Sequence, residues 1–191
     1  FINFDKVMFT TANVNLDANG DLMPFNIRGG DITIGRQGIN ADGLRYIAFL
    51  SQKINIDGQI NGTGADVDLI AGNFDYNPNA NGGNVGVAGD LISERVSRIN
   101  ADGSIVTNRT QAKEGIEIKG KEYTQNTSTY TEGNLTIDAD KVTLNGNGTQ
   151  ANDVRITGDV NNNNTIYAKG NIVLDKNTKS TGQIIAEKSL T

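Results

Sequence analysis

Residues 134–144 read NLTIDADKVTL and residues 153–162 read DVRITGDVNN, and these two stretches decide the fold. In both, apolar residues alternate with polar ones, which is the pattern of a β-strand that buries one face. Asn, Asp and Gly bound each stretch and favour turns. The pattern recurs at a near-constant interval, since Ile118 to Ile137 is 19 residues, Ile137 to Ile156 is 19, and Ile156 to Leu174 is 18.

A period near 20 with two or three strands in each repeat predicts an all-β chain folded as a right-handed parallel β-helix (a solenoid). Each coil stacks about 4.8 Å above the last and buries its apolar face only against its neighbours. We therefore expect Ile118, Ile137, Ile156 and Leu174 to form one inward ladder. A second strand series is expected through Leu144, Ile166 and Ile185. A β-propeller would repeat at roughly 40 residues or more, and a sandwich would lack a fixed superperiod.

Residues 73–113 break this period. They open with the loop-like NPNANGGN at 77–84 and include the hairpin signal Asp102-Gly103 between apolar pairs. We expect them to leave the helix as a β-hairpin, with a short amphipathic helix over 91–99 as the alternative. A Thr-, Ser- and Asn-rich stretch, 123–131, is predicted to be an exposed loop.

From these breaks we expect three consecutive parts in the chain. Residues 1–76 form one part, 77–113 an excursion outside the helix, and 114–191 further coils that continue the first part.

Composition excludes several classes of function. The net charge of −5 argues against a nucleic-acid partner, which requires clustered Lys and Arg. The chain has no cysteine and no histidine, so disulfides, zinc–thiolate sites and histidine general bases are absent.

Two pairs of carboxylates are candidate sites. Asp66 and Asp68, and Asp138 and Asp140, are each two residues apart, so each pair shares one face of a strand. Such pairs bind calcium or act as an acid and a base in some proteins. With 22 acidic residues in the chain, solvent-facing or turn positions explain them better. The sequence therefore predicts no catalytic residue, no metal ligand, no cofactor and no enzyme activity.

Asparagines at turns are expected to stack in ladders from one coil to the next. The candidates are Asn55, Asn134, Asn145 and Asn171.

Four blocks in the first 76 residues resemble the secretion domain of two-partner secretion exoproteins, the filamentous haemagglutinin-like adhesins and contact-dependent inhibition proteins. They are residues 1–11, FINFDKVMFTT; 25–39, FNIRGGDITIGRQGI; 45–56, RYIAFLSQKINI; and 68–73, DLIAGN. Their order and spacing agree with the family. The family's Asn-Pro-Asn motifs are absent and are expected upstream of Phe1, since Asn77-Pro78-Asn79 comes too late in the chain. The blocks indicate the C-terminal part of a secretion domain, followed by β-helix repeats.

The resemblance implies a non-catalytic secretion and structural module of a large bacterial exoprotein. It implies export through the periplasm by a partner outer-membrane β-barrel transporter, and a final place outside or on the surface of a Gram-negative cell. Other parts of such a protein would bind a host or target-cell receptor. The alternatives are a β-helical polysaccharide-active enzyme and an autotransporter passenger.

Overall fold

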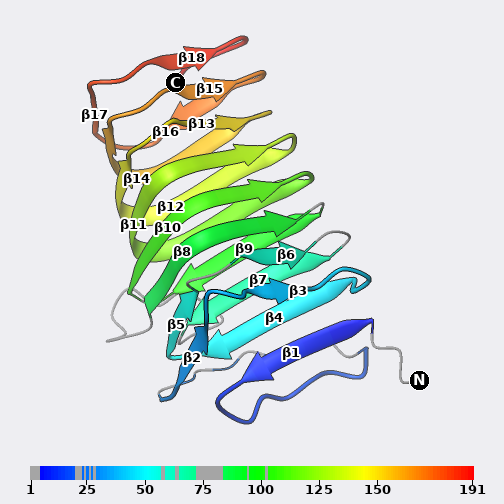
Figure 1. The fold of residues 1–191 in the computed structure, drawn as a ribbon. Coiled ribbons are helices and arrows are strands. Elements are labelled where there is room, and N and C mark those ends of the chain that lie inside the picture. Colours follow the sequence, from blue (N-terminus) through cyan, green and yellow to red (C-terminus); the bar gives the residue numbers. More distant parts are fainter. Residues whose placement is uncertain are drawn as a thin grey trace.

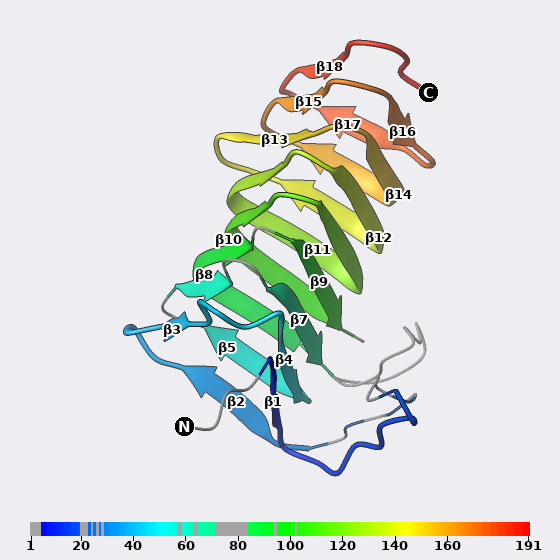
Figure 2. The same ribbon diagram turned by 90° about the vertical axis from the view of Figure 1, so that its right-hand side faces the viewer.

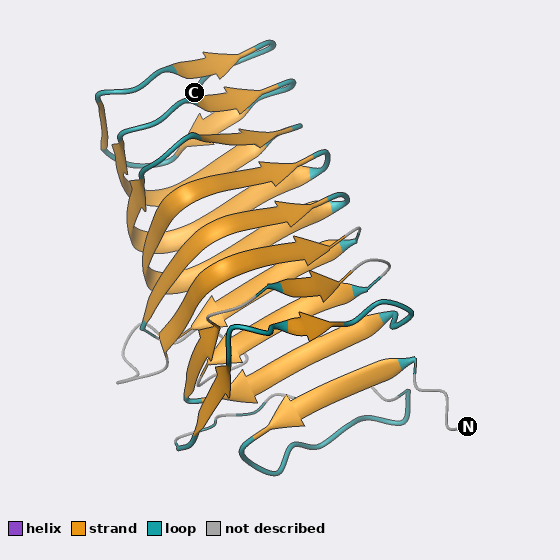
Figure 3. Cartoon of the chain, viewed as in Figure 1, coloured by secondary structure: helices purple, strands orange, loops and turns teal. Residues whose placement is uncertain are grey.

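A computed structural model describes residues 5–19, 23, 25, 27, 29–56, 59–62, 65–71, 84–93, 95–101 and 103–191. The described residues form strands and turns without any helix, and every strand pairing is parallel. The strands stack from β1 at one end to β18 at the other (Figures 1 and 3). The expected all-β parallel β-helix is confirmed.

The strands form three faces, which we call A, B and C, so that each coil visits the faces in turn (Figure 2). Face A stacks β1 (Lys6–Thr10), β4 (Tyr46–Ser51), β7 (Asp66–Ala71), β9 (Val96–Ala101), the first parts of β11 (Gly115–Thr131), β12 (Asn134–Leu144) and β14 (Val154–Asn162), and β16 (Ile172–Leu174). Face B stacks β2 (Asp31–Ile34), β5 (Lys53–Ile56), the first parts of β8 (Asn84–Ser93) and β10 (Ser104–Ala112), later parts of β11, β12 and β14, and β17 (Thr178–Ser180). Face C stacks β3 (Ile39–Asn40), β6 (Ile60–Gly62), the ends of β8, β10 and β11, then β13 (Gly148–Ala151), β15 (Ile166–Ala168) and β18 (Ile184–Ala186).

The predicted inward ladder is present on face A. Ile118 pairs with Ile137, Ile137 with Ile156, and Ile156 with Leu174. The same ladder runs back through Ile99, Leu69 and Phe49 to Phe9. From Phe49 to Ile156 its side chains are fully buried, so one apolar column runs along most of the helix.

The second predicted series is wrong. Leu144 pairs with Asn162, whereas Ile166 lies between Thr149 and Ile184 on face C. Ile185 points outward and is 42% exposed. Corners of different length separate the faces, so residue spacing across a corner does not give the register.

The predicted excursion over 77–113 is wrong for its described residues. β8 pairs with β5, β6 and β10, and β9 pairs with β7 and β11, all in parallel. Leu91, Ile99 and Ile105 are buried in the main core. Neither the hairpin nor the helix exists among these described residues, because the strands follow the same three faces in register with the coils on either side. Residues 77–83, 94 and 102 lie outside the described residues.

The segment 123–131 is also not an exposed loop. It is the second half of β11, and Tyr123, Gln125 and Thr129 point inward and are fully buried. The Tyr123 hydroxyl lies 3.0 Å from that of Thr107 and 3.2 Å from that of Thr129. Polar side chains can therefore occupy the interior here because they satisfy one another's hydrogen bonds.

Three of the four asparagine candidates bond to the next coil. Asn152 donates to Asn134 (3.2 Å), Asn163 to Asn145 (2.9 Å), and Ser189 to Asn171 (2.7 Å). Asn55 differs, since its neighbour in the next coil is Gly86, which has no side chain to continue a ladder.

An extra-helical element does exist, but it follows β1. Ala12, Val14, Phe25 and Ile27 pack against outward side chains of face A, in a second apolar core separate from the interior. Thr11 donates a hydrogen bond of 3.0 Å to the carbonyl of Gly29, which joins the two ends of this element. We call the described residues of 11–27 the outer segment. It lies beside the stack of strands (Figure 2).

Candidate functional site

A polar groove with a volume of about 1020 Å³ lies on the outer surface of face A. Leu16 and Asn19 of the outer segment form one side of it. Strands β1, β4, β7 and β9 supply its floor, with outward side chains that alternate with the buried ladder. The groove therefore depends on the outer segment lying over the first coils.

Three side chains from three consecutive coils meet in this groove. The Tyr46 hydroxyl donates a hydrogen bond of 2.8 Å to Oδ2 of Asp68, and the Arg98 guanidinium donates one of 3.2 Å to Oδ1. The two oxygens of Asp68 thus have different partners. Asp68 is only 6% exposed, which is unusual for a carboxylate outside the core.

Burial dominates the electrostatics of this cluster. It raises the pKa of Asp68 above the usual range, against the hydrogen bond from Tyr46 and the charge of Arg98, which both lower it. Burial, followed by the charge and the hydrogen bond of Asp68, raises the pKa of Tyr46 far above its ordinary value. The phenol therefore stays protonated and keeps its role as a donor.

Ion pairs surround the cluster. Arg45 pairs with Asp5 at 2.9 Å, Arg95 with Asp66 at 3.2 Å, and Arg98 also reaches Glu117 at 3.4 Å. Most of these side chains are well exposed, and such pairs contribute little to stability. They bridge successive coils, so their main effect is to fix the register of neighbouring strands.

The pair Asp66 and Asp68 does share one outer face of a strand, as the sequence predicts, and both residues line the groove. Each carboxylate is occupied by an arginine, which takes the place that a cation or a substrate proton would need. The described residues contain no group of three or more His, Cys, Asp or Glu placed to hold a metal ion.

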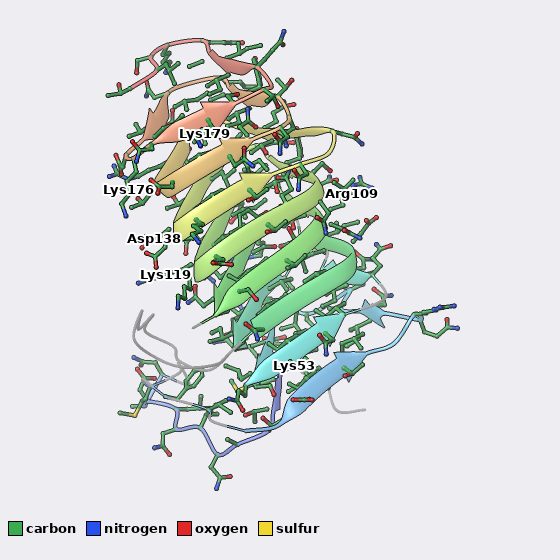
Figure 4. The ribbon with its side chains drawn as sticks, turned by 90° about the vertical axis from the view of Figure 1, so that its left-hand side faces the viewer. Lys53, Arg109, Lys119, Asp138, Lys176 and Lys179 are labelled. Atoms are coloured by element: carbon green, nitrogen blue, oxygen red, sulfur yellow. The ribbon has the colours of Figure 1, made fainter. Side chains whose placement is uncertain are left out.

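Asp138 and Asp140 lie on β12, away from this groove. Asp138 pairs with Lys119 of the preceding coil, and the two residues lie next to each other along one edge of the β-helix (Figure 4). Asp140 is exposed at the bend of the strand. The structure does not bring either carboxylate together with the pair of Asp66 and Asp68.

Sequence reasoning missed Tyr46 and Arg98 as partners of Asp68. They are 22 and 30 residues away from it, and only the register of β4, β7 and β9 brings them together. One signal was available, since an Asp-x-Asp pattern within an apolar strand requires cationic partners on the neighbouring strands.

No helix among the described residues is long and apolar enough to cross a membrane. No protein-family model matches the chain, and no solved structure matches it. A search of curated proteins finds the 16S rRNA endonuclease CdiA of Enterobacter cloacae subsp. cloacae, which is 25% identical over 179 residues. The match covers 83% of this chain but only 5% of that protein. It confirms the resemblance to exoproteins of the contact-dependent inhibition type that the four sequence blocks indicate.

Proposed function

Because the chain is similar to a short part of CdiA and folds as a parallel β-helix, we propose that it is a non-catalytic secretion and structural module of a large bacterial exoprotein. In this proposal a partner outer-membrane β-barrel transporter exports the protein, by way of the periplasm, to the surface of a Gram-negative cell or beyond it. Receptors on target or host cells bind other parts of the exoprotein, and nucleic acid is not a partner.

The observation that carries this proposal is the unbroken parallel stacking of one coil on the next from β1 to β18. Each finished coil presents unpaired N–H and C=O groups to the residues that follow. A chain that emerges from a transporter in an extended form can therefore fold by adding coils to those already made.

The outer segment and the groove give the first coils a special role in this scheme. Leu50 and Ile70 of face A are covered by the outer segment, and the cluster around Asp68 ties three successive coils together. These contacts lie outside the main core and add to the stability of the coils that they join. We propose that they make this end the template for the rest of the helix.

A secretion assay tests the proposal. The natural full-length exoprotein, with or without residues 1–191, is expressed in cells that contain or lack the proposed partner transporter. We expect export of the intact protein only with the transporter, and loss of export on deletion. Equal export of both proteins would show that this region is dispensable.

Two point variants test whether the first coils have this special role. Leu50→Asp places a charge under the outer segment, and we expect reduced export. Thr136→Asp, at an exposed position of β12, serves as the control and should leave export unchanged. Equal reduction by both variants would contradict a special role for the first coils.

A further inference from the structure

Face C carries an outward column of amide, aromatic and aliphatic side chains. Register places one residue of each of six consecutive coils in line, from β8 to β18. The column, which we call the face C strip, consists of Ile92, Gln111, Tyr130, Gln150, Tyr167 and Ile185. The strands that carry its upper half, β13, β15 and β18, stack directly above one another in Figure 1.

The spacing of the strip is regular. Tyr130 and Tyr167 are two coils apart, with Gln150 between them, so their backbones are about 9.6 Å apart along the helix axis. The strip is partly exposed along its length, and Ile185 is 42% exposed. Glu187 accepts a hydrogen bond from the Tyr167 hydroxyl, which restricts the orientation of that ring.

We propose that the face C strip binds an extended, neutral, β-1,4-linked polysaccharide that lies along the helix axis. In such a chain each sugar ring advances by a distance close to the spacing of neighbouring strands, so alternate rings lie over Tyr130 and Tyr167. Tyrosine offers a flat, rigid, amphipathic surface at a low entropic cost. Gln150, which lies between the two tyrosines, presents both a donor and an acceptor, as sugar hydroxyls require.

Charge and shape favour this occupant. The charged side chains bonded to the strip carry opposite signs, since Arg109, which pairs with Asp90, donates to Gln111, and Glu187 accepts from Tyr167. The strip therefore offers a polyanionic glycan no cluster of cations. A linear chain matches a surface that is long and narrow. This inference rests on the register of face C and does not depend on the proposed function.

Isothermal titration calorimetry of the 191-residue chain tests it. The probes are cellohexaose and chitohexaose, the corresponding disaccharides, and maltohexaose, whose α-linkages curl the chain. We expect binding of at least one β-1,4-linked hexasaccharide, much weaker binding of its disaccharide, which cannot reach both tyrosines, and no binding of maltohexaose.

Variants locate the binding. We expect Tyr130→Ala and Tyr167→Ala each to weaken binding about tenfold. Tyr130→Phe and Tyr167→Phe keep the ring and should retain most of the affinity. Val106→Ala, at an exposed position on face B, is the control and should not change it. The proposal is overturned if no β-1,4-linked probe binds, or if both alanine variants bind as tightly as the wild-type chain. It is also overturned if sedimentation shows that the strip instead holds a second copy of the chain.

Discussion

Tyr46 and Asp68 lie in successive coils on the outer surface of face A, and the phenol donates a hydrogen bond of 2.8 Å to the carboxylate. The bond lies at the border between the outer segment and the open part of the groove. A buried carboxylate at this position links the stability of the first coils to pH.

Asp68→Asn should reveal this link. Burial holds the pKa of Asp68 above its ordinary value, so the folded chain binds this proton more tightly than the unfolded chain does. The contribution of this proton to the free energy of unfolding is complete below about pH 4, the pKa of an Asp in the unfolded chain. It is lost as the pH rises through the raised pKa of Asp68 in the folded chain. We therefore expect the free energy of unfolding of the wild type, relative to Asp68→Asn, to fall as pH rises from about 4.

Urea denaturation at a series of pH values measures this difference. Tyr46→Phe removes a hydrogen bond that lowers the pKa of Asp68, so in that background the fall should extend to higher pH. If the free energy of unfolding of the wild type, relative to Asp68→Asn, instead increased with pH, the prediction would be wrong.

Ile137→Asp tests the inward ladder. Ile137 is fully buried between Ile118 and Ile156, so the new charge has no partner and no water. We expect a loss of at least about 4 kcal/mol in the free energy of unfolding. Thr136→Asp, one residue away but exposed, should cost less than about 1 kcal/mol. Similar losses for the two variants would mean that the inward and outward positions are wrongly assigned.

Gly158→Ala tests the corner of β14, where the chain bends from face A to face B. Gly158 has φ of 128°, and an added Cβ would lie 1.7 Å from the carbonyl oxygen of Ala139 in the preceding coil. Both the backbone strain and the clash destabilise the fold, by about 2–4 kcal/mol. Gly35→Ala is the matched control, because an added Cβ there meets nothing within 4 Å. Thermal unfolding of both variants measures this loss. An unchanged melting temperature for Gly158→Ala would refute the close contact between coils.

Leu50→Ala tests the second core. Leu50 is fully buried beneath the outer segment, whereas its neighbour Phe49 points into the main core. We expect Leu50→Ala to speed hydrogen exchange in residues 11–19 while β12 keeps its protection. Phe49→Ala should instead lower the global free energy of unfolding by about 3–5 kcal/mol. Unchanged exchange in 11–19 would show that the outer segment does not depend on this contact.

The sequence by itself determined the class of fold and one ladder. The interval of 18 or 19 residues between Ile118, Ile137, Ile156 and Leu174 arises because every coil must return to the same face with an apolar residue inward. The four blocks in the first 76 residues also indicated the resemblance that the match to CdiA confirms.

Tertiary structure alone decided where the chain leaves the helix and which charged groups meet. β8, β9 and β10 stay in the stack although their spacing in the sequence is irregular, because each pairs in parallel with the coil before it. Phe25 and Ile27 look like strand residues, yet they pack outside face A, since Leu50 and Ile70 offer an apolar outer surface there. Tyr46, Asp68 and Arg98 come together only because parallel coils place residues 22 and 30 positions apart side by side.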